Sequence, residues 1–348
     1  MAHEKNPAPT LRRVGIKDVA DRAGVSIGTV SNVINHPARV SADTLARVRS
    51  AIEALGYVRD ESARQLRAGS SRVLGLLVLD LGNPFFADVA RGVEREAHEA
   101  GLGVMVCTSG QDATLEAKYV SLLSEQRVHG VLLTPMETSG PHLDVLRRRH
   151  VPYALLDRLS ADGTACSVSL DDVAGGALAL RHLLEAGHRR VGFVSGPSTL
   201  QQVRDRREGA ARAVAEAGLP ASALVETATE RLDFAAGVDA GARLLGLPDR
   251  PTAVFCANDL LALGVLQAVF AAGLRVPEEL AIVGYDDIEF AAAAAVPLTS
   301  VRKPAADMGS LAARLLLSEI QDAAGQHEHR QVVLEPELVV RRSSLARR

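Results

Sequence analysis

Carboxylate and amide side chains follow three of the apolar, strand-like runs in this sequence. They are Asp157 at the end of YALLD, Asn258 and Asp259 at the end of AVFCAND, and Asp286 and Asp287 at the end of LAIVGYDD. Taken singly, each is an ordinary turn or cap residue. Their repetition at strand ends instead predicts one shared polar site, since ligands of open α/β sheets bind beyond the carboxyl ends of the strands. The chemistry predicted is recognition of hydroxyl groups.

A pair of aromatic residues completes this predicted site. In NPFF, residues 83–86, Asn83 is a typical N-cap and Pro84 suits the first helical position, so Phe85 and Phe86 begin a helix. The chain has only seven Phe and no Trp, which makes two adjacent rings informative. Apolar rings combined with carboxylates and an Arg fork suit a sugar, which has an apolar ring face and a hydroxyl edge.

No catalytic constellation accompanies these residues. The sequence has no GxSxG, no Walker loop, no GxGxxG after a strand and no CxxC. Cys107, Cys166 and Cys256 lie far apart, which favours buried thiols in a reducing compartment over metal binding. The run HEH at residues 327–329 is the nearest metal candidate, and a polar loop explains it better. We therefore predict no enzyme activity, no cofactor and no metal.

The stretch GVSIGTVSNVIN, residues 24–35, predicts a helix with an unusual outer face. Val30, Val33 and Ile34 form one apolar side. The other side carries no long charged residue and consists of Ile27, Gly28, Thr29, Ser31 and Asn32. The preceding run IKDVADRA and Gly24 predict a first helix and a turn, so the whole reads as a helix-turn-helix. Small side chains would let its second helix approach base edges in the DNA major groove.

Short polar residues around that helix could reach DNA phosphates. The predicted backbone contacts are Ser26, which also caps the helix, Thr29, Ser31 and Asn35. A third helix follows, with Ser41 as its cap and an apolar stripe that ends before Gly56. These three helices predict an all-α head.

The charge distribution favours a polyanion as the partner of this head. Residues 1–72 hold 12 Lys and Arg against 7 Asp and Glu, a net charge of +5, whereas the remainder holds 27 against 35, a net charge of −8. No apolar run approaches the roughly 20 residues of a membrane span, and the N-terminus lacks the apolar core of a signal peptide. We therefore expect a cytoplasmic protein with no membrane partner.

From residue 73 onward, strand-like runs alternate with amphipathic helices. The expected strands are VLGLLVLD, GVMVCTS, GVLLTP, YALLD, RVGFVSG, AVFCAND and LAIVGYDD, and the clearest helices span 86–100, 173–186, 201–217 and 259–272. This alternation predicts an α/β body of parallel sheets with helices on both faces. The segment is too long for one such layer, so two lobes are expected.

The chain resembles the LacI/GalR family of bacterial transcriptional repressors. The run IKDVADRAGVSIGTVSNVINHPARVSADTLARVRSAIEALGY and the run ARQLRAGSSRVLGLLV carry the resemblance, which extends from about Ile16 to Val340. It implies that Ile27, Gly28 and Asn32 read bases. It also implies further contacts with the DNA backbone by Arg39, Ser41 and Thr44.

The segment DESARQLRAGSS, residues 60–71, resembles the hinge of that family. Asp60 can cap a helix of about two turns, which is too short to be stable alone. The resemblance implies that the helix forms when two copies pack on DNA. Leu66, beside Arg64, would then insert into a minor-groove step and kink the duplex.

The resemblance further implies a two-lobed, periplasmic-binding-protein-like fold whose chain crosses between the lobes three times. We expect the crossings near 158–163, 287–299 and 321–330. The expected domains are a disordered tail (1–14), a helix-turn-helix domain (15–59), a hinge (60–72), and an effector-binding and dimerisation domain (73–343) with an N-lobe (about 73–160 and 290–321) and a C-lobe (about 161–289 and 322–343). The expected effector-binding residues in the cleft between the lobes are Asn83, Phe85, Phe86, Asp157, Arg206, Asn258, Asp286 and Lys303, with Leu200, Gln201 and Gln202 on its wall.

These observations predict a repressor that binds a pseudo-palindromic DNA operator as a homodimer, under the control of a small molecule, most simply a sugar. The end of the chain, RRSSLARR, has no leucine heptads that would join dimers into tetramers. A regulator that ignores small molecules, or one that responds to a nucleoside or nucleobase, stays open as an alternative. A sugar-binding protein without a DNA role would instead need an export signal and no basic head.

Overall fold

The computed structural model describes residues 14–57, 71–322 and 325–345. The chain divides into two compact units, residues 1–69 and 70–348, and each is described by itself. The expected hinge residues Arg64 and Leu66 lie outside the described residues, as does the expected tail up to residue 13.

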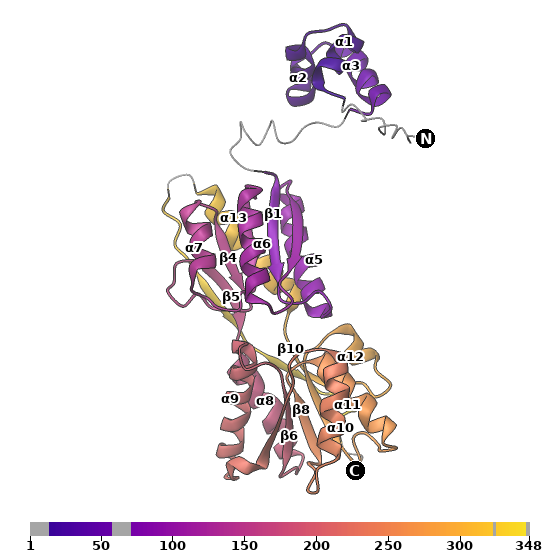
Figure 1. Cartoon of the computed structure of the whole chain (residues 1–348), viewed down its shortest axis with the longest axis vertical. Coiled ribbons are helices and arrows are strands. Elements are labelled where there is room, and N and C mark those ends of the chain that lie inside the picture. Colours follow the sequence, from indigo (N-terminus) through magenta and orange to yellow (C-terminus); the bar gives the residue numbers. More distant parts are fainter. Residues whose placement is uncertain (1–13, 58–70, 323–324, 346–348) are drawn as a thin grey trace, which may run out of the picture. The chain divides into compact units, whose positions relative to one another are not determined.

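The first unit is a small helical domain that contains the predicted helix-turn-helix (Figure 1). Its elements are α1 (Ile16–Ala23), α2 (Ile27–Asn35), the 3-10 helix η1 (Pro37–Arg39) and α3 (Ala42–Leu55). Val19, Val30 and Val48, one from each α-helix, are fully buried and form the centre of its core. Gly24 ends α1 with a φ of 64°, a left-handed conformation that glycine adopts without steric cost.

The second unit contains two lobes, each built on a six-stranded sheet (Figure 1). The N-lobe sheet has the order β11-β5-β4-β3-β1-β2, with β1 (Val73–Val78), β2 (Gly103–Thr108), β3 (Gly130–Leu133), β4 (Tyr153–Leu156), β5 (Cys166–Leu170) and β11 (Gln331–Leu334). The C-lobe sheet has the order β12-β10-β9-β8-β6-β7, with β6 (Val191–Ser195), β7 (Leu224–Ala228), β8 (Ala253–Cys256), β9 (Ala281–Asp286), β10 (Thr299–Arg302) and β12 (Glu337–Val339). All neighbours pair in parallel except β10 and β12.

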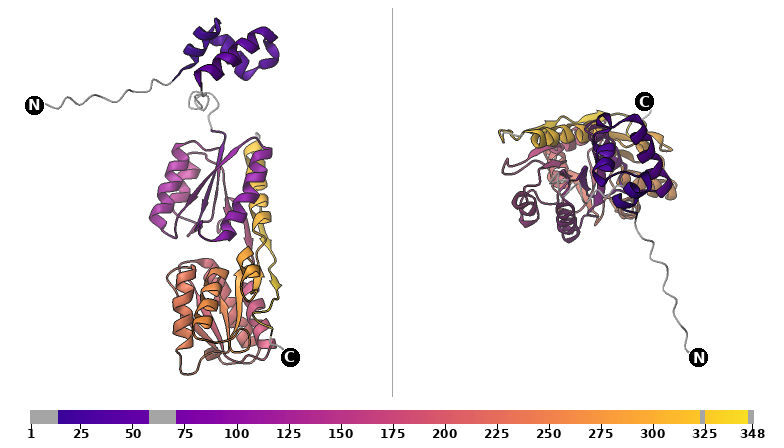
Figure 2. Two further views of the ribbon diagram at one scale, coloured as in Figure 1. Left: turned by 90° about the vertical axis from the view of Figure 1, so that its right-hand side faces the viewer. Right: turned by 90° about the horizontal axis from the view of Figure 1, so that it is seen from above.

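Helices cover both faces of each sheet, as expected from the βα alternation (Figure 2). In the N-lobe they are α5 (Pro84–Glu99), α6 (Ala113–Glu125), α7 (Pro141–Arg148) and α13 (Ala305–Gln321). In the C-lobe they are α8 (Asp172–Glu185), α9 (Gln201–Glu216), α10 (Phe234–Leu245), α11 (Asp259–Ala271) and the short α12 (Glu289–Ala293), with the 3-10 helix η2 (Ala221–Ala223) before β7. Strand β1 shows the two-sided burial, because Leu74 and Leu76 belong to one apolar cluster and Leu77 to another.

The chain crosses between the lobes three times, but at positions other than those expected. The crossings lie at residue 171 between β5 and α8, at 303–304 between β10 and α13, and at 335–336 between β11 and β12. The expected positions were wrong because β5, β10 and β11 are short strands (CSVSL, TSVR and QVVL) at or next to sheet edges. They lack the long Val, Ile and Leu runs that mark central parallel strands.

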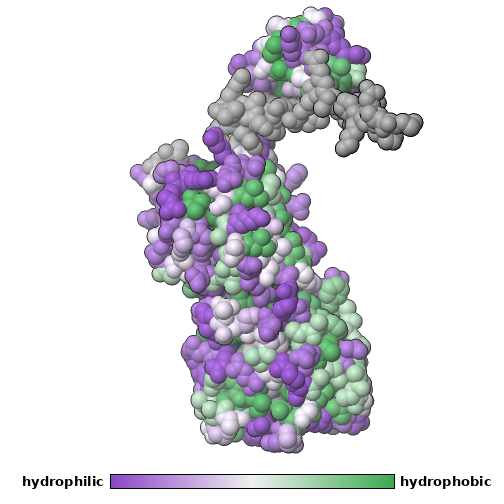
Figure 3. Space-filling model, viewed as in Figure 1, coloured by the Kyte–Doolittle hydropathy of each residue, from purple (hydrophilic) through white to green (hydrophobic). Residues whose placement is uncertain are grey.

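Hydrophilic residues are distributed over the visible face of both lobes (Figure 3). None of the helices in the described part of the chain is both long enough and apolar enough to cross a lipid bilayer.

Candidate DNA interface and effector cleft

The outer face of α2 presents the three residues predicted to read bases. Ile27, Gly28 and Asn32 are all exposed, whereas Val30 and Val33 of the same helix are buried. The exposed fraction of Ile27 is 48%. A helix face of this composition can approach the edges of bases closely.

Polar residues at the ends of α2 are held by local hydrogen bonds. The Ser26 hydroxyl accepts a hydrogen bond from the Thr29 amide at 3.1 Å and lies 2.9 Å from the Thr29 hydroxyl, so Ser26 caps the helix as predicted. At the other end, Asn35 Nδ2 donates to the Ser31 carbonyl at 2.9 Å. These bonds fix the positions of four side chains expected to face phosphates.

Ser41 occupies the N-cap position of α3, as predicted. Its hydroxyl donates to Thr44 Oγ1 at 3.0 Å, and within the described residues it accepts no hydrogen bond from a backbone amide. Arg39, the last residue of η1, is exposed. The predicted position of the cap is thus confirmed, although its side chain makes no cap hydrogen bond, and Arg39 and Ser41 are exposed while Thr44 is partly buried.

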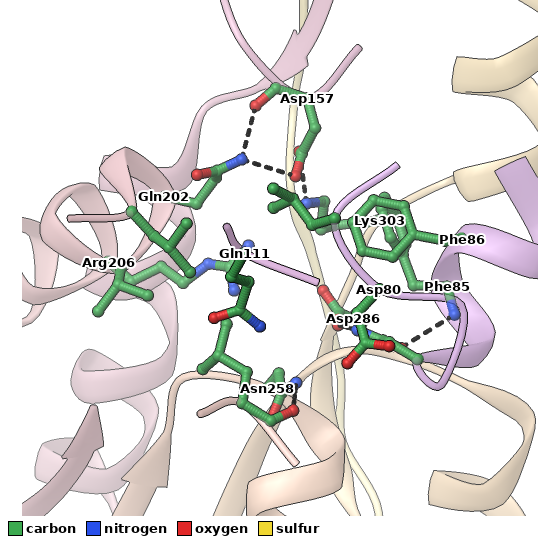
Figure 4. A pocket seen from close by; sticks show the side chains of 15 residues that line it. Asp80, Phe85, Phe86, Gln111, Asp157, Gln202, Arg206, Asn258, Asp286 and Lys303 are labelled. Carbon is green, nitrogen blue, oxygen red and sulfur yellow. Dashed lines mark hydrogen bonds and ion pairs between the residues drawn. The ribbon is translucent and has the colours of Figure 1, made fainter. Parts of the chain in front are cut away.

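All eight residues predicted to bind an effector line one cleft between the lobes (Figure 4). The cleft encloses about 480 Å³ of empty space, part of it open to solvent. Its lining is Leu79, Asp80, Asn83, Phe85, Phe86, Gln111, Asp157, Leu200, Gln202, Val203, Arg206, Leu232, Asn258, Asp286 and Lys303. Gln201, which was predicted on the wall, is not among these residues, and five lining residues were not predicted: Leu79, Asp80, Gln111, Val203 and Leu232. Of these, Asp80 ends the run VLGLLVLD and carried the same strand-end signal as Asp157.

Two cleft carboxylates are held by backbone in the left-handed region. The φ angles are 59° for Asp157 and 100° for Asp286. Residues other than glycine rarely adopt this conformation, Asp and Asn being the most tolerant, and such strain concentrates at functional sites. Asp287 also has a positive φ, of 56°, but its carboxylate accepts hydrogen bonds from Arg302 and Arg341 and serves the C-lobe framework.

A buried ion pair and an inter-lobe hydrogen bond meet at Asp157. Lys303 Nζ lies 2.5 Å from Asp157 Oδ1 and 4.3 Å from the centre of the Phe85 ring. Gln202 Nε2, from α9 of the C-lobe, donates to the Asp157 carboxylate and to its backbone carbonyl, both at 3.1 Å. Because Lys303 is only 3% exposed, the ion pair is buried, and removal of either partner would leave a buried charge unpaired.

Arg206 is also buried and paired. Its Nε donates to Asp172 Oδ1 at 2.9 Å and its Nη1 to the Ala257 carbonyl at 2.6 Å, while the guanidinium lies 3.8 Å from the centre of the Tyr285 ring. Burial raises the pKa of Asp172, but the positive charges of Arg206 and Lys303 and the hydrogen bonds to this carboxylate together outweigh burial, so the pKa lies below its ordinary value. Arg206 is thus a fixed cation at the cleft wall.

Two asparagines at the cleft each cap a helix through the oxygen of the side-chain amide. Asn83 Oδ1 accepts from the Phe85 amide and caps α5, while its Nδ2 crosses the cleft and donates to Asp286 Oδ2, each at 3.0 Å. Asn258 Oδ1 accepts from the amide of Leu261 at 2.9 Å, and its Nδ2 donates to the carbonyl of Leu232 at 3.0 Å. Each amide therefore has only part of its hydrogen-bonding capacity left for a ligand.

The two phenylalanines form an apolar wall. The ring centres of Phe85 and Phe86 lie 5.0 Å apart with an interplanar angle of 75°, an edge-to-face pair. Asp259, another predicted strand-end residue, does not line the cleft. It is fully buried, accepts hydrogen bonds from the Ser300 hydroxyl at 2.7 Å and the Ile288 amide at 2.9 Å, and burial raises its pKa well above the usual range.

Comparison with known proteins gives consistent matches for both units. Residues 15–60 match the family described as bacterial regulatory proteins, lacI family, and residues 180–344 match a periplasmic binding protein-like domain. The ribose operon repressor of Escherichia coli (strain K12) is 37% identical over 330 residues, which cover 94% of this chain and 99% of that protein. The repressor PurR of Photobacterium profundum is 33% identical over 331 residues, which cover 94% and 98%.

Solved structures agree. The lac repressor dimer bound to operator and the anti-inducer ONPF matches with a TM-score of 0.82 at 27% identity, covering 96% of this chain and 100% of that one. A LacI family transcriptional regulator from Enterococcus faecium with bound ribose matches with a TM-score of 0.73 at 29% identity, covering 78% and 98%.

Proposed function

The chain belongs to the lacI family of bacterial regulatory proteins, and from this premise we propose which small molecule controls it and which residues contact that molecule and DNA. It is a DNA-binding transcriptional repressor with a helix-turn-helix head and a two-lobed body, and its affinity for operator DNA depends on a small molecule. The proposed effector is a neutral sugar, with ribose the first candidate.

The observation that carries this assignment is that both buried cations of the cleft are already neutralised. Arg206 is paired with Asp172, and Lys303 with Asp157. An anionic ligand would need a cation free to receive it, because a buried unpaired charge is costly. Hydroxyl groups, in contrast, can donate to the carboxylates of Asp157 and Asp286 and accept from the remaining N–H groups of Arg206.

The apolar wall supports a sugar in the same position. The ring of Phe85 offers a flat apolar surface beside these polar groups, which matches the two-sided character of a sugar ring. Ribose is the first candidate because a ribose operon repressor and a structure with bound ribose are among the relatives. PurR relatives of similar identity make a nucleobase the second candidate.

For the DNA contacts, we propose that Ile27, Gly28 and Asn32 read base edges from the exposed face of α2. Backbone contacts are proposed for Ser26, Thr29, Ser31, Asn35, Arg39, Ser41 and Thr44. The minor-groove roles of Arg64 and Leu66 rest on the family resemblance, since both residues lie outside the described part of the chain. The proposed assembly is a homodimer on a pseudo-palindromic operator, as in the dimeric lac repressor. It would act in the bacterial cytoplasm, where the operator lies, and by binding alone, without a catalysed reaction.

The proposed mechanism is linkage between the cleft and the head. The bonds Asn83–Asp286 and Gln202–Asp157 join the two lobes directly, so a ligand that inserts between these groups changes the lobe closure that they favour. Such coupling is typically about 1–3 kcal/mol, and it is reciprocal, so DNA must change sugar affinity by the same factor.

Thermal unfolding of the purified protein tests the effector assignment. The panel is ribose, other neutral mono- and disaccharides, sugar phosphates and nucleobases. A ligand at 100 times its dissociation constant adds about 2.7 kcal/mol of stability. We expect stabilisation by ribose or another neutral sugar, and none by sugar phosphates. Stabilisation by nucleobases alone would refute the sugar assignment, and the absence of any stabiliser would favour a ligand-independent regulator.

A further inference from the structure

Four side chains with metal-binding donor atoms gather in the N-lobe. Cys166 is the first residue of β5, Glu319 lies near the end of α13, and His327 and His329 lie in the segment that leads into β11. One donor atom of each residue lies within 4.8 Å of the donor atoms of the other three. None of the four lines the effector cleft.

The distances between these donors are close to those of a tetrahedral site. Cys166 Sγ lies 3.1 Å from His327 Nε2 and 4.0 Å from His329 Nδ1, and His329 Nδ1 lies 3.9 Å from Glu319 Oε2. With zinc–ligand bonds of about 2.0–2.3 Å, neighbouring donors of a tetrahedron lie about 3.3–3.8 Å apart. Shifts of about 1 Å or less in the donor positions would therefore complete the coordination.

Hydrogen bonding among the described residues leaves one oxygen of this cluster without a partner. Glu319 Oε2 is buried, and among the described residues it has no hydrogen-bond partner. A buried oxygen without a partner is energetically costly, and a bound cation would remove this cost. The Arg330 amide donates a hydrogen bond to Cys166 Sγ at 3.4 Å, which helps to hold the sulfur in place beside the other donors.

We propose that Cys166, Glu319, His327 and His329 bind one zinc ion. Thiolate and imidazole ligands select zinc over the hard cations magnesium and calcium. Four protein ligands leave no open position for water, which is typical of a structural site. From sequence, the HEH run was predicted to be a polar loop and the cysteines to bind no metal, and the proposed zinc site replaces both interpretations.

The location of the site indicates what the ion does. Cys166 begins β5, and His329 lies two residues before β11, so the ion joins the starts of two parallel neighbours to the end of α13 (Figure 1). Strand β11 lies at the sheet edge and leads directly into the third lobe crossing. The effector cleft lies beyond the opposite, carboxyl ends of the strands. Zinc therefore anchors an edge strand of the N-lobe without contact with the effector.

Cobalt and zinc titrations of the full-length, metal-depleted protein test the proposal. We expect one ion per chain, a tetrahedral cobalt spectrum with a sulfur-to-cobalt charge-transfer band, and a zinc-dependent rise in melting temperature. Cys166→Ser should abolish the charge-transfer band, whereas Cys107→Ser, which changes a thiol of β2 in the same lobe, should retain it. Glu319→Gln and His327→Gln should each weaken zinc affinity at least tenfold.

Several outcomes would overturn the assignment. They are a wild-type protein with no charge-transfer band, a band that persists in Cys166→Ser, and zinc affinity that is the same in Glu319→Gln, His327→Gln and the wild type. If Cys166→Ser does not fold, the two Gln variants decide, since both keep the size of the side chain close to the original. These results do not depend on the identity of the effector, because the cobalt spectrum, the zinc affinity and the melting temperature are all measured without sugar or DNA.

Discussion

Lys303 Nζ lies 2.5 Å from Asp157 Oδ1, in a pair that joins two segments 146 positions apart in the sequence. Asp157 follows β4 of the N-lobe, and Lys303 lies where the chain crosses from β10 to α13. The pair fixes this crossing where it lines the cleft. It also neutralises the Asp157 carboxylate, which accepts a hydrogen bond from Gln202 of the C-lobe. If the proposed effector site is correct, stability and effector recognition depend on the same two side chains.

Removing the lysine should destabilise the body. Lys303→Met leaves the Asp157 carboxylate buried without its cation, so we expect a loss of about 3–5 kcal/mol in the free energy of unfolding. Urea denaturation measures this loss. In the double variant Asp157→Asn, Lys303→Met, no buried charge is left unpaired, and much of the loss should be recovered. Equal stabilities of the wild type and Lys303→Met would show that the pair is not coupled to folding.

Changing the second cleft carboxylate should affect effector binding and leave DNA binding intact. Asp286→Asn keeps the size of the side chain but removes one acceptor oxygen. We propose that this oxygen accepts a hydrogen bond from a sugar hydroxyl, so we expect at least a tenfold loss in sugar affinity, equivalent to about 1.4 kcal/mol. Calorimetry and operator-binding assays measure the two functions. Asp239→Asn, at an exposed position on α10, is the matched control. If Asp286→Asn also weakens operator binding when that binding is measured in the absence of sugar, this division of roles is contradicted.

Much of the cleft could be predicted from sequence because its signals are local. Asp157 and Asp286 directly follow apolar runs, and Phe85 follows a cap residue and a proline, so the pattern itself marks the edge where these residues meet. The lobe crossings could not be placed in this way. The crossings depend on strands such as CSVSL. This strand has only two large apolar residues, so its sequence resembles a connecting loop.

The proposed zinc ligands illustrate what sequence patterns miss. Cys166 and His327 are separated by 161 positions, and only the parallel pairing of β5 with β11 brings them together. Neither strand was expected, so no local pattern joined the cysteine to the HEH run. The periodicity of the sequence predicted the two lobes. Contacts between the first residues of neighbouring strands depend instead on the order of the strands in the sheet, which periodicity does not reveal.

Glu116 should make the stability of the protein depend on pH. This residue of α6 is 2% exposed, and burial raises the pKa of its carboxyl group to about 7, although a hydrogen bond from the Met136 amide lowers it. Because the folded-state pKa is raised, the protonated form is favoured on folding. The associated stability is present below about pH 4.5 and is lost as the pH rises through about 7.

The variant Glu116→Gln removes this titration and keeps an oxygen for the Met136 amide. Relative to the wild type, it should gain stability between pH 5 and pH 8, by about 3 kcal/mol at most. Urea denaturation at several pH values, in metal-free buffer, measures the difference. Glu125→Gln, at the exposed end of the same helix, should parallel the wild type. A constant difference between Glu116→Gln and the wild type across this range would exclude the effect.

The exposed face of α2 gives the sharpest test of DNA recognition. Asn32 can form a bidentate pair with adenine N6 and N7, so Asn32→Ala should cost about 1–3 kcal/mol and relax the preference at one symmetric pair of operator positions. Arg39→Ala is the control, because loss of a phosphate contact should weaken binding to all sequences alike and reduce the salt slope by about 0.9 per contact. Selection of sites from random duplexes at two salt concentrations separates these effects. If Asn32→Ala leaves the selected motif unchanged, this residue does not read bases, and the uncharged surface of α2 has another cause.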